Sequence, residues 1–246
     1  MKYYYCSLLL LLSLSINILA QKIDLSAEKT SFSVVDLSSN KISFKASINE
    51  LNFSIVKSNY NIFSSILINE YVTNHKIGSP DLPTLNKLID MPYGANVEIN
   101  ILSKTEQLID LSGELINQIA PAQPSLSKGD DASSVPFILD ESVYSSNSFL
   151  SPEVAKVIPL GTMRGHKLGR LEFCPFQYNP VTNVLKVLTE IEFEINFIGA
   201  DHVLTNEIHS KFNSNHFNTS FNSLINTKMN QNKDMLMTYP VKYVIV

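Results

Sequence analysis

Cys174 is the residue of this 246-residue chain whose side chain is best suited to nucleophilic catalysis. A cysteine attacks as the thiolate, and a low thiol pKa needs a neighbouring histidine, another cation or a helix N-terminus. Cys174 lies instead in the apolar run LEFCPF at residues 171–176, which is typical of a buried strand. We therefore expect Cys174 to be structural, and we assign no catalytic residue.

Three histidines, His202, His209 and His216, recur every seven residues. On a helix, seven residues make two turns and span about 10 Å, whereas the ligands of one metal ion lie about 2 Å from it. The spacing therefore favours the exposed face of a linker over a metal site, and no metal or cofactor is expected. A metal-binding linker is the third class of function left open.

The segment IAPAQPSLSKGDDASSVP at residues 119–136 carries a second side chain of interest, Lys128. Prolines stiffen the first half of this segment, a lone basic residue follows between Ser127 and Gly129, and acidic residues come next. This composition predicts an exposed loop. We call it the basic loop; a lysine in such a loop is by itself no sign of function.

Charge and motif content exclude several classes of function. The net charge is −4 and the pI is about 5.7, so no basic field attracts nucleic acid or anionic lipid. The sequence lacks the paired CxxC spacing of a zinc ribbon and the GxGxxG, GxxxxGK[ST], HExxH and GxSxG motifs. Most familiar enzyme classes and a nucleic-acid partner are thereby excluded.

Alternation of apolar and polar residues with a period of two predicts strands. The clearest run extends from Leu185 to Phe197, and its polar face carries Glu190, Glu192 and Glu194, which we expect to be exposed. Such an exposed acidic face also protects a sheet against unwanted pairing.

Two further runs alternate in the same way. Residues 41–55 do so with a change of face near Asn49-Glu50, as at a bulge or tight turn, and residues 97–101 form the second run. Turn formers separate these runs, and no long helix-period stripe is present. The expected fold class is all-β, an antiparallel β-sandwich or partly closed barrel, over residues 21–200.

The N-terminal residues 1–20 have a basic start, a short apolar run and a small residue, Ala20, before a polar segment. This pattern predicts a secretory signal peptide cleaved after Ala20. The apolar run is short for a membrane span, so we expect no stable membrane insertion. The expected route is through export machinery and the periplasm to the cell surface or extracellular space.

The C-terminal part changes character after residue 200. Residues 201–238 are rich in Asn, Ser and Lys, which predicts a linker with weak local structure. Residues 239–246 are apolar again and are typical of the beginning of a buried strand. From this we expect the natural protein to continue beyond Val246.

Several segments resemble, in order and spacing, the N-terminal propeptide of gingipain-type cysteine peptidases, clan CD enzymes exported by Gram-negative Bacteroidota. These segments are GSPDLP at 78–83, IAP at 119–121, Arg164-Gly165, and FQYNPVTNVLKVLTEI at 176–191. The resemblance covers about residues 75–200, and KYVIV at 242–246 is similar to the first strand of the family's catalytic domain. It implies a sandwich prodomain that assists folding and blocks the active-site cleft of the catalytic domain in the same precursor. The catalytic Cys/His dyad would lie beyond residue 246.

In this family the blocking element is a loop whose arginine enters an acidic S1 pocket. Counting from IAP, the matching position here is Lys128, so the resemblance implies an inhibitory loop formed by Ser127, Lys128 and Gly129. Lysine and arginine are not equivalent in a pocket built for a planar guanidinium. The peptidase could be lysine-directed or accept both residues, or the loop could have drifted.

The resemblance also implies that cutting the linker releases the peptidase. Between residues 201 and 242 there is no arginine. The candidate processing sites are Lys211, Lys228, Lys233 and Lys242. An arginine-only peptidase could not cut itself out here, so lysine-directed cutting or another protease is required.

The rival interpretation is a free-standing adhesive or carbohydrate-binding β-sandwich of an exported protein. Such a module needs an exposed aromatic platform, and Tyr144, Phe149 and Tyr178 do not form a clear one in the sequence.

Overall fold

The computed structural model describes residues 21–58, 61–73, 76–129, 131, 135–212 and 217–226. The strands are β1 (Gln21–Asp24), β2 (Ser31–Leu37), β3 (Lys41–Ser47), β4 (Glu50–Lys57), β5 (Ile62–Leu67), β6 (Tyr71–Val72), β7 (Thr84–Met91), β8 (Asn96–Asp110), β9 (Ala155–Met163), β10 (His166–Phe173), β11 (Phe176–Asn179) and β12 (Val184–Ile198). The helices are α1 (Glu141–Tyr144), α2 (His202–Phe212) and the 3-10 turn η1 (Asn218–Phe221).

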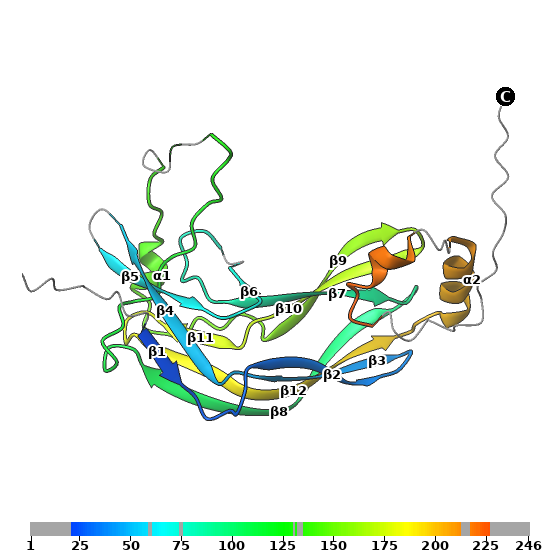
Figure 1. Ribbon diagram of the computed structural model, residues 1–246, viewed down its shortest axis with the longest axis horizontal. Helices are drawn as coiled ribbons and strands as arrows, with labels where there is room; N and C mark the ends of the chain where they lie inside the picture. Colours follow the sequence, from blue (N-terminus) through cyan, green and yellow to red (C-terminus); the bar gives the residue numbers. More distant parts are fainter. Residues whose placement is uncertain are drawn as a thin grey trace, which may run out of the picture.

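The strands form three antiparallel sheets that pack as a long sandwich (Figure 1). The strand orders are β1-β4-β5, β6-β7-β10-β9 and β11-β12-β3-β2, and β8 pairs with the other edge of β12. β8 and β2 remain edges, so the sheet does not close on itself. The expected antiparallel all-β fold is confirmed, as an open sandwich and not as a barrel.

Strand β12 connects the two main hydrophobic clusters of the core. Its first part contributes Leu185 and Val187 to one cluster, and its second part contributes Phe193 to the other. Phe193 stacks on Phe173 of the opposing sheet with the ring centroids 5.5 Å apart, and on Phe44 of β3 at 5.0 Å. The sandwich is therefore closed by apolar side chains that alternate along a single strand.

The glutamates of β12 lie on the opposite face, as their alternation predicts. Glu192 pairs with Lys45 of β3 at 3.0 Å, and Glu194 lies 3.6 Å from Lys41. This face of the sheet is covered by charged side chains and carries no reactive carboxylate pair.

The change of face near Asn49-Glu50 is a crossing between two sheets. The Ile48 N–H donates to the Thr189 carbonyl of β12 at 2.9 Å, and the Asn49 carbonyl accepts from the Leu25 N–H at 2.6 Å. The chain thus leaves β3 in one sheet and enters β4 in another, with Ile48 and Leu51 both buried.

The predicted alternation of residues 41–55 fails at its last apolar residue, because Ile55 is 55% exposed and does not face inward. The next residue, Val56, packs instead against a third cluster that contains Phe63 and Tyr144. The packed face of β4 therefore changes once more towards the end of the strand.

The expectation of weak local structure directly after residue 200 is also wrong, because residues 202–212 form helix α2. Asp201 accepts a hydrogen bond from the Leu204 N–H at 2.9 Å, which is typical of an N-cap. At Gly165, whose φ is +83°, a Cβ atom would lie only 3.0 Å from the Ile208 side chain, so glycine permits this close packing. Tertiary contacts therefore stabilise a helix that the local sequence does not predict.

The signal-peptide prediction (residues 1–20), most of the predicted linker beyond residue 226 and the apolar residues 239–246 lie outside the described residues. Their boundaries stay predictions. Within the described ranges, neither helix has the length and the apolar character that crossing a bilayer would require.

Replacing Leu171 by alanine tests the packing between the sheets. Leu171 of β10 is fully buried, so Leu171→Ala is expected to lower the free energy of unfolding by about 2–5 kcal/mol. Leu102→Ala on β8 is the matched control, because Leu102 is 57% exposed and its truncation should cost less than about 1 kcal/mol. Equal losses in chemical denaturation would contradict this account of the core.

The thiol of Cys174 is expected to be unreactive in the folded protein. Burial raises its pKa to about 11, so at pH 8 only about 0.1% is thiolate. Labelling with iodoacetamide at pH 8, followed by peptide mass spectrometry, should leave Cys174 unmodified until guanidinium is added. Rapid modification of the native protein would show that Cys174 is accessible and activated.

Candidate functional site

The beginning of the basic loop is built into the sandwich by backbone hydrogen bonds. The Ala120 N–H donates to the Ser64 carbonyl of β5 at 2.8 Å, and the Ala120 carbonyl accepts from the Asp81 N–H at 2.9 Å. The Ala122 N–H donates to the Ser79 carbonyl at 2.9 Å. The GSPDLP and IAP segments therefore lie next to each other in the fold, although they are far apart in the sequence.

Two buried tyrosines fix Ile119 from either side. The Tyr144 hydroxyl donates to the Ile119 carbonyl at 2.6 Å, and the Ile119 N–H donates to the Tyr178 oxygen at 3.2 Å. Tyr178 in turn donates to Asn183 Oδ1 at 2.7 Å. Burial raises the pKa of Tyr178 to about 12, so its hydroxyl stays protonated and able to donate. The FQYNPVTN segment thus contributes directly to the base of the basic loop.

The two sides of the basic loop are joined by Gln123 and Ile138. The Gln123 Nε2 donates to the Ile138 carbonyl at 2.7 Å, and the Ile138 N–H donates to Gln123 Oε1 at 2.9 Å. The adjacent Phe137 ring stacks on Phe63 with the centroids 5.6 Å apart. The loop therefore leaves and re-enters the sandwich through a closed and packed base.

Beyond this base the loop extends away from the sheets, at the end of the molecule opposite α2 (Figure 1). Lys128 is exposed, and no hydrogen bond or ion pair of its ammonium group is found among the described residues. Gly129 has a φ of +112°, with nothing within 4 Å of the position that a Cβ would occupy. The predicted residues Ser127, Lys128 and Gly129 are therefore together at an exposed tip.

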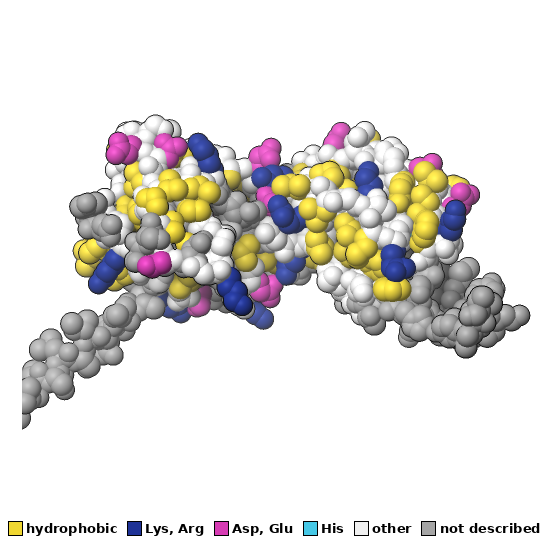
Figure 2. Space-filling model, turned by 90° about the horizontal axis from the view of Figure 1, so that it is seen from above, with side chains coloured by type: hydrophobic (Ala, Val, Ile, Leu, Met, Phe, Trp, Pro, Cys, Tyr) yellow, Lys and Arg dark blue, Asp and Glu magenta, His cyan; other side chains and the backbone are white. Residues whose placement is uncertain are grey.

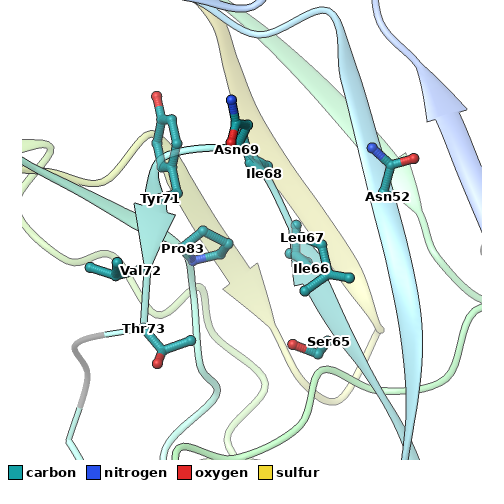
Figure 3. A pocket seen from close by; sticks show the side chains of 10 residues that line it. All are labelled: Asn52, Ser65, Ile66, Leu67, Ile68, Asn69, Tyr71, Val72, Thr73 and Pro83. Carbon is teal, nitrogen blue, oxygen red and sulfur yellow. The ribbon is translucent and has the colours of Figure 1, made fainter.

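A surface cavity of about 360 Å³ lies beside this base, between β5 and β6 (Figure 3). Its lining is apolar or neutral, with Ile66, Pro83 and Tyr71 among the side chains that the view shows. Burial raises the pKa of Tyr71 well above its usual value, so this hydroxyl is no base at neutral pH. Among the described residues that line it, the cavity therefore holds no acid, base or nucleophile suited to catalysis.

Cys174, the nucleophile considered first, is buried, and its Sγ lies 3.9 Å from the Phe176 carbonyl. Its raised pKa agrees with a structural cysteine.

The equally spaced histidines do not act together. His202 hydrogen-bonds Asn40, whereas His209 faces Asp90 of β7 and His166 of β10. His216 lies outside the described residues. The expected exposed face of a linker is wrong for His209, whose side chain is 13% exposed. Its partners are far away along the chain, so no local pattern predicts these contacts.

Of the candidate processing sites, the structure describes Lys211, which is exposed near the end of α2. Lys228, Lys233, Lys242 and the predicted signal cleavage site at Ala20 lie outside the described residues.

Two solved structures resemble this fold. The prodomain from the study of zymogenic latency of gingipain K from Porphyromonas gingivalis superimposes with a TM-score of 0.68 at 36% identity, over 73% of this chain and 98% of that one. The complex of the RgpB pro- and mature domains from the same organism matches with a TM-score of 0.64 at 18% identity, over 79% of this chain and 96% of that chain.

Sequence relatives agree with this comparison. Lys-gingipain of P. gingivalis is 34% identical over 235 residues, which are 95% of this chain and 14% of the relative. Gingipain R1 of the same species is 26% identical over 151 residues, which are 61% of this chain and 14% of the relative. This chain thus spans about 14% of the length of these relatives. The family model Propeptide_C25 matches residues 29–225, and the chain therefore belongs to the C25 propeptide family, as a non-catalytic domain of the gingipain type.

Proposed function

We propose that this domain keeps a gingipain-like cysteine peptidase latent by inserting Lys128 into the S1 pocket of the active-site cleft. The observation that supports this most directly is the exposed ammonium at the tip of a loop whose base is rigidly held. The partner is the catalytic domain of the same precursor, and the chain itself contributes no catalysis.

The inhibition follows from substrate-like binding. The Lys128 ammonium pairs with a carboxylate of the pocket, and the extended backbone of the loop forms strand-like hydrogen bonds along the cleft. A tethered domain has an effective concentration of about 1 mM, so even a loop with a Kd of about 1 μM would fill about 99.9% of the sites. Cutting the connection removes this advantage, and the domain then dissociates on dilution.

The base of the loop contributes by limiting the entropy lost on binding. Gln123, Tyr144 and Tyr178 already hold the two sides of the loop, so few backbone torsions have to be ordered in the complex. Only the exposed tip has to adapt to the cleft.

A surface for docking surrounds this base. Figure 2 shows exposed apolar side chains on both lobes, including the lobe that carries the basic loop. Exposed apolar residues of β5, β6 and the loop are Ile62, Leu67, Val72 and Leu126. Burying them against the catalytic domain would add apolar contact to the interaction of Lys128.

We further propose that the peptidase is lysine-directed. The relatives that match 95% of this chain are named Lys-gingipain, whereas the gingipains R match 61–63% of it. Lysine occupies the tip, and lysines supply the candidate processing sites Lys211, Lys228, Lys233 and Lys242. A pocket that prefers an ammonium explains both features.

Folding assistance and secretion complete the proposal. The predicted signal peptide, cleaved after Ala20, would direct the precursor through the export machinery and the periplasm to the outside of the cell. Latency until that point would protect the cell from its own peptidase.

Replacing Lys128 by alanine tests the inhibitory role. Lys128→Ala should raise the inhibition constant against mature Lys-gingipain at least about tenfold, because one charge-assisted hydrogen bond in a closed pocket contributes about 1.5–3 kcal/mol. Lys29→Ala is the matched control, since Lys29 is also an exposed lysine and lies outside the basic loop. An unchanged inhibition constant for Lys128→Ala would refute the assignment.

Replacing Gln123 by alanine tests the contribution of the rigid base. The Ile138 N–H and carbonyl lose their shared partner, so we expect about three- to tenfold weaker inhibition although Lys128 is intact. Gln107→Ala on β8 is the control and should leave the inhibition constant unchanged. Identical inhibition by the wild type and Gln123→Ala would show that the base need not be held.

A further inference from the structure

The end of the sandwich opposite the basic loop holds a cluster of three side chains with metal-binding atoms. Asp90 is on β7, His166 is on β10 and His209 is on α2. Their side chains are 9%, 16% and 13% exposed. The three potential ligand atoms lie within 4.8 Å of one another. A carboxyl group and two imidazoles thus lie close together at a largely buried position.

The distances fit a small tetrahedral ion. Asp90 Oδ2 lies 2.7 Å from His166 Nδ1 and 3.6 Å from His209 Nε2. Ligands bound at about 2.0–2.1 Å around a tetrahedral zinc ion are about 3.3 Å apart, a value between these two distances. To bind an ion, the Asp90–His166 pair would open by about 0.6 Å from its hydrogen-bonded distance. The stacked rings of His166 and His209, whose centroids are 4.1 Å apart, would also turn so that one nitrogen of each faces the ion.

Two atoms of the cluster lack the partners that buried polar atoms normally have. Asp90 Oδ1 and His209 Nε2 are buried and accept or donate no hydrogen bond among the described residues. An unsatisfied buried polar atom costs about 1–3 kcal/mol, so such atoms point to a missing partner.

Neighbouring residues hold the three ligands in place, and a surface cavity connects the cluster to solvent. Asn226 accepts from the Asp90 N–H at 2.8 Å and donates to the Asp90 carbonyl at 2.7 Å. The Phe221 ring lies 4.0 Å from His166, centroid to centroid. Asp90, His209 and Asn226 also line a surface cavity of about 350 Å³. This cavity gives an ion access from solvent and provides room for a fourth ligand, a water molecule.

We propose that Asp90, His166 and His209 bind one Zn²⁺ ion, which fastens helix α2 to the sandwich. Imidazole nitrogens with one carboxylate suit zinc, whereas calcium and magnesium prefer oxygen ligands alone. Two ligands come from neighbouring strands and the third from α2, so the ion joins the helix to the sheet. Lys211 lies two residues after His209, and zinc would therefore hold the backbone around this lysine in the helix.

Zinc binding is measured on protein that has first been stripped of metal with EDTA and then dialysed against about 10 μM free Zn²⁺. This concentration would fill a site whose Kd is about 1 μM. Elemental analysis should find zinc in the wild type. The His209→Gln variant should bind zinc with an affinity at least about tenfold lower and should therefore retain much less of it. Glu207→Gln is the matched control, because Glu207 is an exposed carboxylate on the same helix and lies outside both the cluster and the cavity. Zinc binding unaffected by His209→Gln, or no binding to the wild type, would overturn the proposal.

Two further measurements separate a metal ligand from a merely structural histidine. In EDTA, His209→Gln should melt close to the wild type, and added zinc should raise the Tm of the wild type alone. Zinc should also slow trypsin cleavage after Lys211 in the wild type, because cleavage there requires local unfolding of α2. If His209→Gln does not fold, His166→Gln replaces it. If zinc binds but does not slow this cleavage, the proposal that the ion fastens α2 to the sandwich is refuted.

Discussion

The structure depends on the burial of one face of β12. In the part of the chain that the structure describes, Cys174 is the one cysteine and it is free, so no disulfide holds the sheets together there. Leu185, Val187 and Phe193 instead extend through both main clusters of the core. β12 pairs with β3 and β11 on one edge and with β8 on the other, so it fixes the register of every strand in its sheet except β2, which pairs with β3.

The basic loop shows how this scaffold can present an exposed charge. The backbone groups of Ile119, Ala120 and Ala122 are used in hydrogen bonds to the sandwich. Gln123 then closes the loop against Ile138, and the remaining tip turns outward. A flexible loop of the same composition could reach the same cleft, but it would lose more conformational entropy on binding.

Sequence reasoning recovered the parts of the fold that rest on local pattern. Alternation identified β12 and the change of face at Asn49-Glu50, because the more buried and the less buried side chains alternate along these strands. It did not identify β7, whose burial pattern does not alternate. It also missed α2, which depends on contacts at Gly165, and the meeting of Asp90 with His209, since neither leaves a local signature in the sequence.

The positions of the basic loop and α2 bear on how an inhibitor of this kind could be released. If Lys128 occupies the cleft, it is protected there, and the first cut has to fall elsewhere in the chain. Lys211 lies at the opposite end of the sandwich, so cutting near it would leave the base around Gln123 and Tyr144 intact. Such a cut would remove the effective concentration that the tether supplies, without changing the intrinsic affinity of the loop. Release would then be governed by dilution and by the stability of α2 against local unfolding, and neither quantity depends on the active site.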